Sequence, residues 1–113
     1  MRVTQADTLN PELASEARQL GELLSRLRIA RGVKQTDAAL RAGLSRNTVY
    51  RMEKGDPGVA FGQILRYLDV VAPGLSLAQL FTEADPALAA LALREKRQRV
   101  RSLTAEQLRE VDF

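Results

Sequence analysis

Apolar side chains recur every three or four positions along most of the chain, which is the spacing that places them on one face of an α-helix. The first run opens at Asn10-Pro11, a capping residue followed by a proline suited to the first helical turn, and Gly32 ends it. Four shorter runs follow. The pattern predicts helices over residues 11–31, 35–41, 46–54, 61–71 and 77–81.

The segments between these runs contain residues that start and stop helices. Gly43 tolerates a positive φ and should end the second helix, and Ser45 should cap the third. Residues 56–58 read Asp-Pro-Gly, a turn sequence. Ser76 and Gln79 form a capping-box pattern before the last short helix.

The chain divides into one folded unit and two flanking segments. We expect residues 1–10 to be a mobile polar tail, residues 11–82 to be a five-helix all-α domain, and residues 83–113 to be a C-terminal helical extension. The boundary should lie at residues 83–86, and a separately capped piece should start at Thr104.

Composition narrows the possible functions. The 113 residues include 45% hydrophobic and only 4% aromatic residues, so Leu, Ala, Val and Ile must build the core. The chain has no Cys and no His, which excludes disulfides and removes the commonest metal ligand and general base. We therefore expect no enzyme activity, no metal and no cofactor. Without a long apolar run or a signal-peptide pattern, the expected compartment is the cytoplasm.

Residues 35–55 contain the most informative spacing. Two helices that cross in a tight turn need a small side chain at the crossing, which Ala39 supplies, and a turn residue tolerant of positive φ, which Gly43 supplies. Leu44 and Val49 would anchor the second helix to the core. The outer face of that helix would then be free to enter a DNA groove.

This set of residues resembles the helix-turn-helix of the phage-repressor/Cro family, also called the Xre type. The resemblance covers about residues 16–82, including the flanking helices, and implies a five-helix repressor-like domain. The matching positions in the motif itself are Gln35, Ala38, Ala39, Gly43, Leu44, Ser45, Val49, Glu53 and Gly55.

The resemblance makes residues 46–54 the recognition helix and implies two sets of DNA contacts. Arginine pairs with guanine and asparagine with adenine through two hydrogen bonds each. The base-reading residues are expected to be Arg46, Asn47, Tyr50 and Arg51. The phosphate contacts are expected to be Lys34, Gln35, Thr36, Thr48 and Lys54.

Three positions need a separate interpretation. Lys34 stands where the family usually has a capping Ser or Thr, and Tyr50 stands where it often has a small residue. Glu53 is expected to be structural and to pair with a nearby arginine.

The implied function is repression of the protein's own operon by a homodimer on a two-fold operator. The stretch 53–59 also resembles Xre-type antitoxins that are encoded beside HipA-type toxins and bind both toxin and DNA, which gives an alternative. A protein-interaction adaptor that has lost DNA binding is a third possibility. Acidic or apolar residues on the recognition helix would favour the adaptor, whereas Arg46, Asn47 and Arg51 favour DNA.

The extension carries a basic segment at residues 94–101, with five basic residues, one acidic residue and a local net charge of +4, against +3 for the whole chain. Three interpretations stay open: a solvated helix end, extra DNA-phosphate contacts, or a docking surface for another protein. Just before it, Leu88 and Leu91 are spaced to pack on the domain or on a second subunit. The regions 75–81 and 88–93 are the expected homodimer interface.

Overall fold

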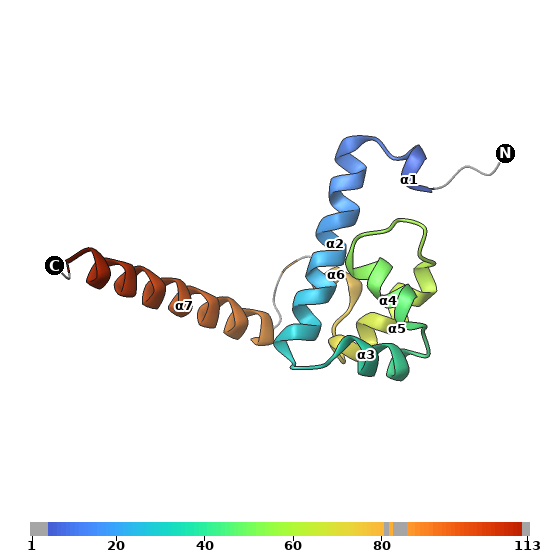
Figure 1. Ribbon diagram of the computed structural model, residues 1–113. Coiled ribbons are helices and arrows are strands. Elements are labelled where there is room, and N and C mark those ends of the chain that lie inside the picture. The colour runs from blue at the N-terminus through green and yellow to red at the C-terminus, as the bar shows by residue number, and fades with distance from the viewer. Residues whose placement is uncertain (1–4, 81, 83–85, 112–113) are drawn as a thin grey trace.

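A computed structural model describes residues 5–80, 82 and 86–111 of the chain. Within these residues it contains helices and no strand, which confirms the all-α fold class (Figure 1). The helices in chain order are α1 (Gln5–Thr8), α2 (Pro11–Ala30), α3 (Gln35–Ala42), α4 (Arg46–Glu53), α5 (Phe61–Val71), α6 (Leu77–Leu80) and α7 (Pro86–Val111).

The five predicted helices are α2 to α6, and the predicted caps explain where they begin. The side chain of Asn10 accepts a hydrogen bond from the backbone N–H of Leu13 at 2.9 Å, so the first turn of α2 is satisfied. At α6, the N–H of Gln79 donates to the Ser76 hydroxyl at 3.1 Å, and the N–H of Ser76 donates to the Gln79 side chain at 2.8 Å. Both halves of the capping box are therefore present.

The core lies where α2, α3, α4 and α5 face one another, and α6 and the start of α7 close it. Small alanines on α3 let the neighbouring helices approach closely, and aliphatic side chains fill the remaining space. The buried residues of this cluster are Leu24, Leu27, Ala38, Ala39, Ala42, Val49, Met52, Tyr67, Leu68, Val71, Ala72, Leu80 and Leu88.

The segment before residue 11, expected to be a mobile polar tail, contains one short helix that the sequence pattern did not predict. Residues Gln5–Thr8 form the single turn α1, in which the Thr8 hydroxyl donates to the carbonyl oxygen of Gln5 at 2.8 Å. Threonine can satisfy a nearby backbone carbonyl in this way, and sequence periodicity does not register a one-turn helix.

The expected separate piece at Thr104 is also wrong, because α7 is continuous through it. The helix has no glycine or proline after Pro86. The Thr104 hydroxyl donates to the carbonyl oxygen of Val100 at 3.0 Å, four residues back, as threonines within helices do. A sequence pattern that can cap the start of a helix thus lies in the interior of α7.

The first turns of α7 are attached to the body of the protein. Leu88 is buried in the core cluster, so packing on the domain is realised within one chain. The guanidinium of Arg26 on α2 donates to the carboxylate of Glu95 at 2.7 and 3.2 Å. Beyond this pair α7 projects away from the body (Figure 1). The predicted boundary at 83–86 lies, up to residue 85, outside the described residues.

None of the helices in the described residues combines the length and the apolar content needed to cross a membrane.

Candidate nucleic-acid interface

Helices α3 and α4 form the helix-turn-helix unit, and Gly43 makes the turn between them. Gly43 has a φ of +68°, a left-handed conformation that costs glycine little. It lets the N–H of Leu44 donate to the carbonyl of Ala39 at 2.9 Å, which closes the end of α3. Ala39 is buried at the crossing, as the sequence predicted.

The N-terminus of α4 is fixed by Ser45. Its hydroxyl accepts a hydrogen bond from the backbone N–H of Thr48 at 3.0 Å and lies 2.8 Å from the Thr48 hydroxyl. The predicted cap is therefore confirmed. At the start of α3, by contrast, Lys34 makes no side-chain cap, as expected for lysine in that position.

One face of α4 is buried, and it carries one charged group. Val49 and Met52 enter the core as predicted, and Glu53 lies beside them with a side chain only 5% exposed. A buried carboxylate is stable only if it is paired and hydrogen-bonded. The surroundings of Glu53 meet that requirement.

Glu53 accepts hydrogen bonds from three other helices. The guanidinium of Arg28 on α2 donates to it at 2.7 and 3.0 Å, and the side-chain amide of Gln35 on α3 donates at 2.9 Å. The hydroxyl of Tyr67 on α5 donates a short hydrogen bond to the same carboxylate. Arg28 also donates to the carbonyl of Val33 at 2.9 Å. The predicted pairing of Glu53 with an arginine is confirmed.

These contacts set the protonation states of the network. Burial by itself would raise the pKa of Glu53, but hydrogen bonds from Arg28, Tyr67 and Gln35 outweigh it and hold the pKa below its ordinary value. Burial, and then the bond to the Glu53 carboxylate, raises the pKa of Tyr67. At neutral pH the network is therefore a carboxylate, a guanidinium and a neutral phenol.

Besides the Arg28–Glu53 ion pair, the C-terminal end of α4 contacts α2 directly through backbone atoms. A Cβ atom added to Gly21 on α2 would lie 2.6 Å from the backbone nitrogen of Gly55 and 2.7 Å from the carbonyl oxygen of Met52. A Cβ atom on Gly55, whose φ is +81°, would lie 2.5 Å from the Cα of Arg18. Only glycine allows this approach, so α2 and the end of α4 have one fixed separation.

The opposite face of α4 is open to solvent. Arg46, Asn47 and Tyr50 are exposed on it, and the Lys54 ammonium lies 5.6 Å from the centre of the Tyr50 ring. This distance is within the range of a cation–π contact. Three of the four predicted base-reading residues are therefore exposed on α4.

Arg51, the fourth, is held by an acid that the sequence analysis did not identify as its partner. Its guanidinium donates to the carboxylate of Asp56 at 2.7 Å, and Asp56 also accepts from the N–H of Gly58 at 2.8 Å. These two bonds, the one from Arg51 first, lower the pKa of Asp56. Arg51 is therefore half-buried and oriented by the turn that follows α4.

The five predicted phosphate contacts differ in their surroundings. Lys34, Thr36 and Lys54 are exposed, and Thr48 is half-buried beside Ser45. Gln35 is half-buried, and its amide donates to Glu53. Its side chain thus has a role within the fold that the sequence analysis did not predict.

Tyr67 is the other residue that sequence analysis missed. It is fully buried, and it joins α5 to the carboxylate on α4. A signal existed, because residue 67 falls on the apolar face defined by Ile64, Leu68 and Val71. A tyrosine on such a face requires a buried partner for its hydroxyl.

The unit was compared with known proteins. A family model described as a helix-turn-helix domain matches residues 19–80, which is more than half of the chain and includes every helix from α3 to α6. No curated protein and no solved structure gives a significant match. On the strength of this match and of the α3–turn–α4 geometry, the chain belongs to the helix-turn-helix domain family.

Proposed function

We propose that the protein is a sequence-specific DNA-binding regulator of transcription that reads bases with the exposed face of α4. The observation that carries the proposal is the division of this helix into two faces. One face is locked to α2, α3 and α5 through Glu53, and the other presents Arg46, Asn47 and Tyr50 to solvent. A rigid helix with a polar outer face suits the major groove.

The proposed base contacts follow from the chemistry of these side chains. Arg46 lies at the N-terminal end of α4, the end that contacts base edges in this class of motif, and can pair with guanine. Asn47 can pair with adenine, and Tyr50 can contact a thymine methyl group or a sugar. Arg51 would reach a base from the position in which Asp56 holds it.

The proposed phosphate contacts surround this face. Lys34, Thr36 and Lys54 are exposed and can reach a phosphate directly, with Thr48 beside them. For Gln35 we assign the contact to its backbone N–H, because its side-chain amide donates to Glu53. The first N–H groups of a helix have no partner within the helix and favour anions.

We further propose that the protein acts as a homodimer that represses its own operon. A single small domain reads too few base pairs for high affinity, and two copies related by a two-fold axis read half-sites about one helical turn apart. Within the helix-turn-helix family we assign it to the Xre type, on the motif residues Gln35, Ala39, Gly43, Val49 and Glu53.

The antitoxin function is less well supported than repression. It depends on the stretch 53–59, and those residues already have structural roles. Glu53 bonds to three helices, Gly55 contacts α2, and Asp56 orients Arg51. The adaptor function is disfavoured because the exposed face of α4 carries no acidic residue.

Selection of bound duplexes from a random DNA pool tests the proposal. We expect enrichment of a two-fold sequence, and affinity that falls by roughly two or more orders of magnitude between about 50 and 200 mM salt. Arg46→Ala should weaken enrichment of the same sequence, in line with a loss of about 1–3 kcal/mol in binding it. Arg18→Ala, which removes an exposed arginine on α2, should leave it unchanged. A pool that stays random with the unmodified chain would refute sequence-specific binding.

A further inference from the structure

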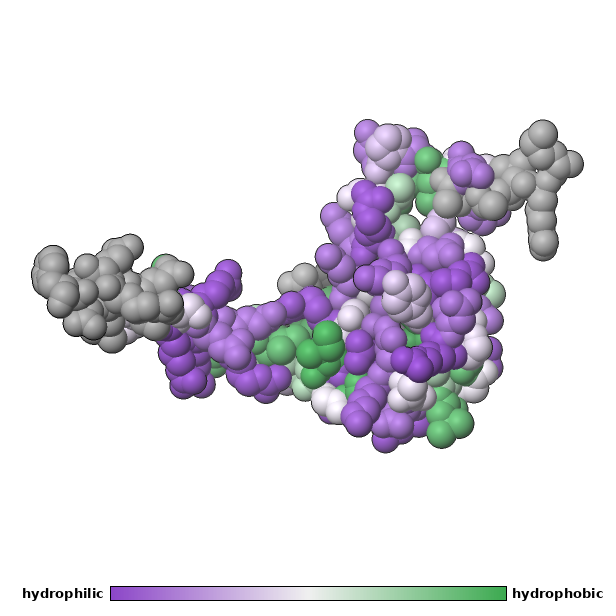
Figure 2. All heavy atoms as spheres, in the orientation of Figure 1, coloured by the Kyte–Doolittle hydropathy of each residue, from purple (hydrophilic) through white to green (hydrophobic). Residues whose placement is uncertain are grey.

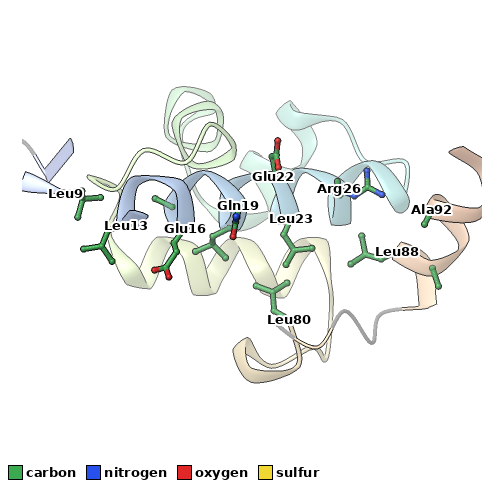
Figure 3. Close-up of a pocket in the computed structure, with 13 residues that line it drawn as sticks. Leu9, Leu13, Glu16, Gln19, Glu22, Leu23, Arg26, Leu80, Leu88 and Ala92 are labelled. Atoms are coloured by element: carbon green, nitrogen blue, oxygen red, sulfur yellow. The ribbon is translucent and has the colours of Figure 1, made fainter. Parts of the chain in front are cut away.

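An apolar groove lies along α2 on the side where α6 and α7 approach it (Figure 3). Its volume is about 1090 Å³, and its walls include Leu13, Leu20, Leu23, Leu80, Leu88 and Ala92. Figure 3 shows Leu23, Leu80 and Leu88 close together where the three helices meet, with Leu13 further along α2. Exposing such an apolar surface to water is unfavourable, and covering it with another apolar surface lowers the free energy.

The helix α7 carries an apolar surface that the described part of its own chain leaves exposed. Leu93 is 49% exposed, Val100 56% and Leu103 58%. At 100° per residue Leu93 and Val100 lie on the side of the helix away from the buried Leu88 and Leu91, and Leu103 lies about 60° from Val100 in the direction of Leu88. Helices in water gain most of their stability from packing such a face. Figure 2 shows hydrophobic residues where α7 leaves the body.

The groove and the helix carry opposite charges. Glu16 and Glu22 line the groove together with Arg26, whose charge is paired with Glu95. Neither glutamate forms an ion pair with another described residue. The α7 helix carries a row of exposed cations that likewise form no ion pair within the part of the chain that the structure describes. They are Arg94, Lys96, Arg97, Arg99 and Arg101.

We propose that the groove of each protomer is covered by α7 of a second copy of this chain. The stripe of Leu93, Val100 and Leu103 would lie against the leucines of the groove, and the arginines beside it would face Glu16 and Glu22. The inference rests on the homodimer proposed above and names its contact surface. At about 39 Å for its 26 residues, α7 is long enough to reach a second body.

Charge and polarity favour a second copy over DNA as the occupant. Phosphates would be repelled by the two glutamates of the groove, and DNA offers no counterpart to the apolar stripe on α7. Both halves of a complementary surface, one apolar and acidic and one apolar and basic, are present on the same chain. An exchange of α7 helices around a two-fold axis would satisfy both grooves at once.

Two charge reversals test the proposal. The groove variant carries Glu16→Lys and Glu22→Lys, and the helix variant carries Arg97→Glu and Arg101→Glu. All four side chains are exposed, so the fold should persist. Light scattering over a concentration series should show that the dimer dissociation constant of each variant rises by roughly tenfold or more. An equimolar mixture should recover dimers of near wild-type affinity, because each α7 then meets a groove of opposite charge.

A second variant tests the apolar part of the contact. Val100→Glu with Leu103→Glu should give a monomer with unchanged helix content, since both side chains are more than half exposed. Leu40→Glu, at a leucine on α3 that is 81% exposed, and Asp69→Lys on α5 are the matched controls and should leave the dimer intact.

The remaining outcomes overturn the proposal in distinguishable ways. If only the helix variant dissociates, two α7 helices pair with each other and the groove is not the site. If neither variant dissociates, α7 does not cover the groove. The same follows if the equimolar mixture dimerises no more tightly than either variant alone. Selection of duplexes from the random DNA pool tests the DNA-binding proposal separately. That proposal fails only if the unmodified chain selects no sequence.

Discussion

The carboxylate of Glu53 on α4 accepts both a 2.7 Å and a 3.0 Å hydrogen bond from the guanidinium of Arg28 on α2. Because Gln35 and Tyr67 donate to the same carboxylate, four helices meet at one charged group. Three of those helices are thereby tied to the back of α4. The orientation of the exposed face of α4 therefore depends on this group.

Glu53→Gln should lower the free energy of unfolding by about 3 kcal/mol, because removing one partner of a buried ion pair leaves the other charge uncompensated. Urea denaturation measures the change. Asp69→Asn, at an exposed position on α5, is the control and should change stability by less than about 0.5 kcal/mol. A loss of similar size in both variants would show that the buried network contributes nothing specific.

Stability should decrease in acid in a way that depends on Glu53. Its folded pKa lies below its ordinary value of 4.5, so the charged carboxylate stabilises the fold above that pH. This contribution is lost as the pH falls from about 4.5 through the lower folded pKa. Thermal melts between pH 7 and pH 2 should show a steeper decline for the unmodified chain than for Glu53→Gln. Parallel declines would contradict the prediction.

Gly21→Ala should destabilise the fold by several kcal/mol, because its Cβ would lie 2.6 Å from the Gly55 nitrogen and backbone must move to admit it. Gly62→Ala on α5 is the matched control. A Cβ there meets nothing within 4 Å, and alanine favours helix, so that variant should gain up to about 1 kcal/mol. Melting temperatures that move in the same direction for both variants would argue against a close backbone contact.

Substitutions should distinguish the residues that contact bases from those that contact phosphates. Arg46→Ala should cost about 1–3 kcal/mol on the selected operator and much less on random DNA. Lys34→Ala should weaken both about equally and reduce the slope of affinity against salt by about one unit. Fluorescence anisotropy with the two duplexes at several salt concentrations measures each effect. If Arg46→Ala weakened the affinity for both duplexes equally, Arg46 would contribute only electrostatic attraction to DNA and would not read a base.

Asp56→Ala should reduce specificity while it increases affinity for random DNA. The carboxylate holds the Arg51 guanidinium at 2.7 Å, which fixes its direction before DNA arrives. Without it the arginine is mobile, and one negative charge near the phosphates is gone. We expect random DNA to bind several-fold tighter and the ratio of operator to random affinity to fall. An unchanged ratio would mean that Arg51 does not read a base.

Local signals in the sequence predicted the helices of the domain closely. The hydroxyl of Ser45 and the side chain of Asn10 accept hydrogen bonds from backbone N–H groups three residues further along the chain. Gly43 ends α3 through its own positive φ. Interactions of such short range leave a readable pattern. The exposed face of α4 was predictable for the same reason, since Val49 and Met52 define the buried side over two turns.

Contacts between distant residues could not be predicted from spacing. Arg28 and Glu53 are 25 positions apart, and nothing local marks Arg28 as the partner among the three arginines of α2. The family resemblance implies a DNA contact for Gln35, and nothing near it in the sequence marks Glu53, on another helix, as the acceptor of its amide. The error at Thr104 is different, since the same residue pattern caps one helix and continues another, and only the preceding turn decides between them.

The backbone contact between Gly21 and Gly55 also has an evolutionary meaning. Where Gly21 faces Gly55 no side chain separates α2 from the turn after α4, so the distance at this point does not depend on which aliphatic residues fill the core. Core substitutions can accumulate without shifting the register in which the outer helix face meets its target. Under the proposed function, substitutions at the exposed positions 46, 47 and 50 would change the DNA sequence that is bound while this separation stays the same.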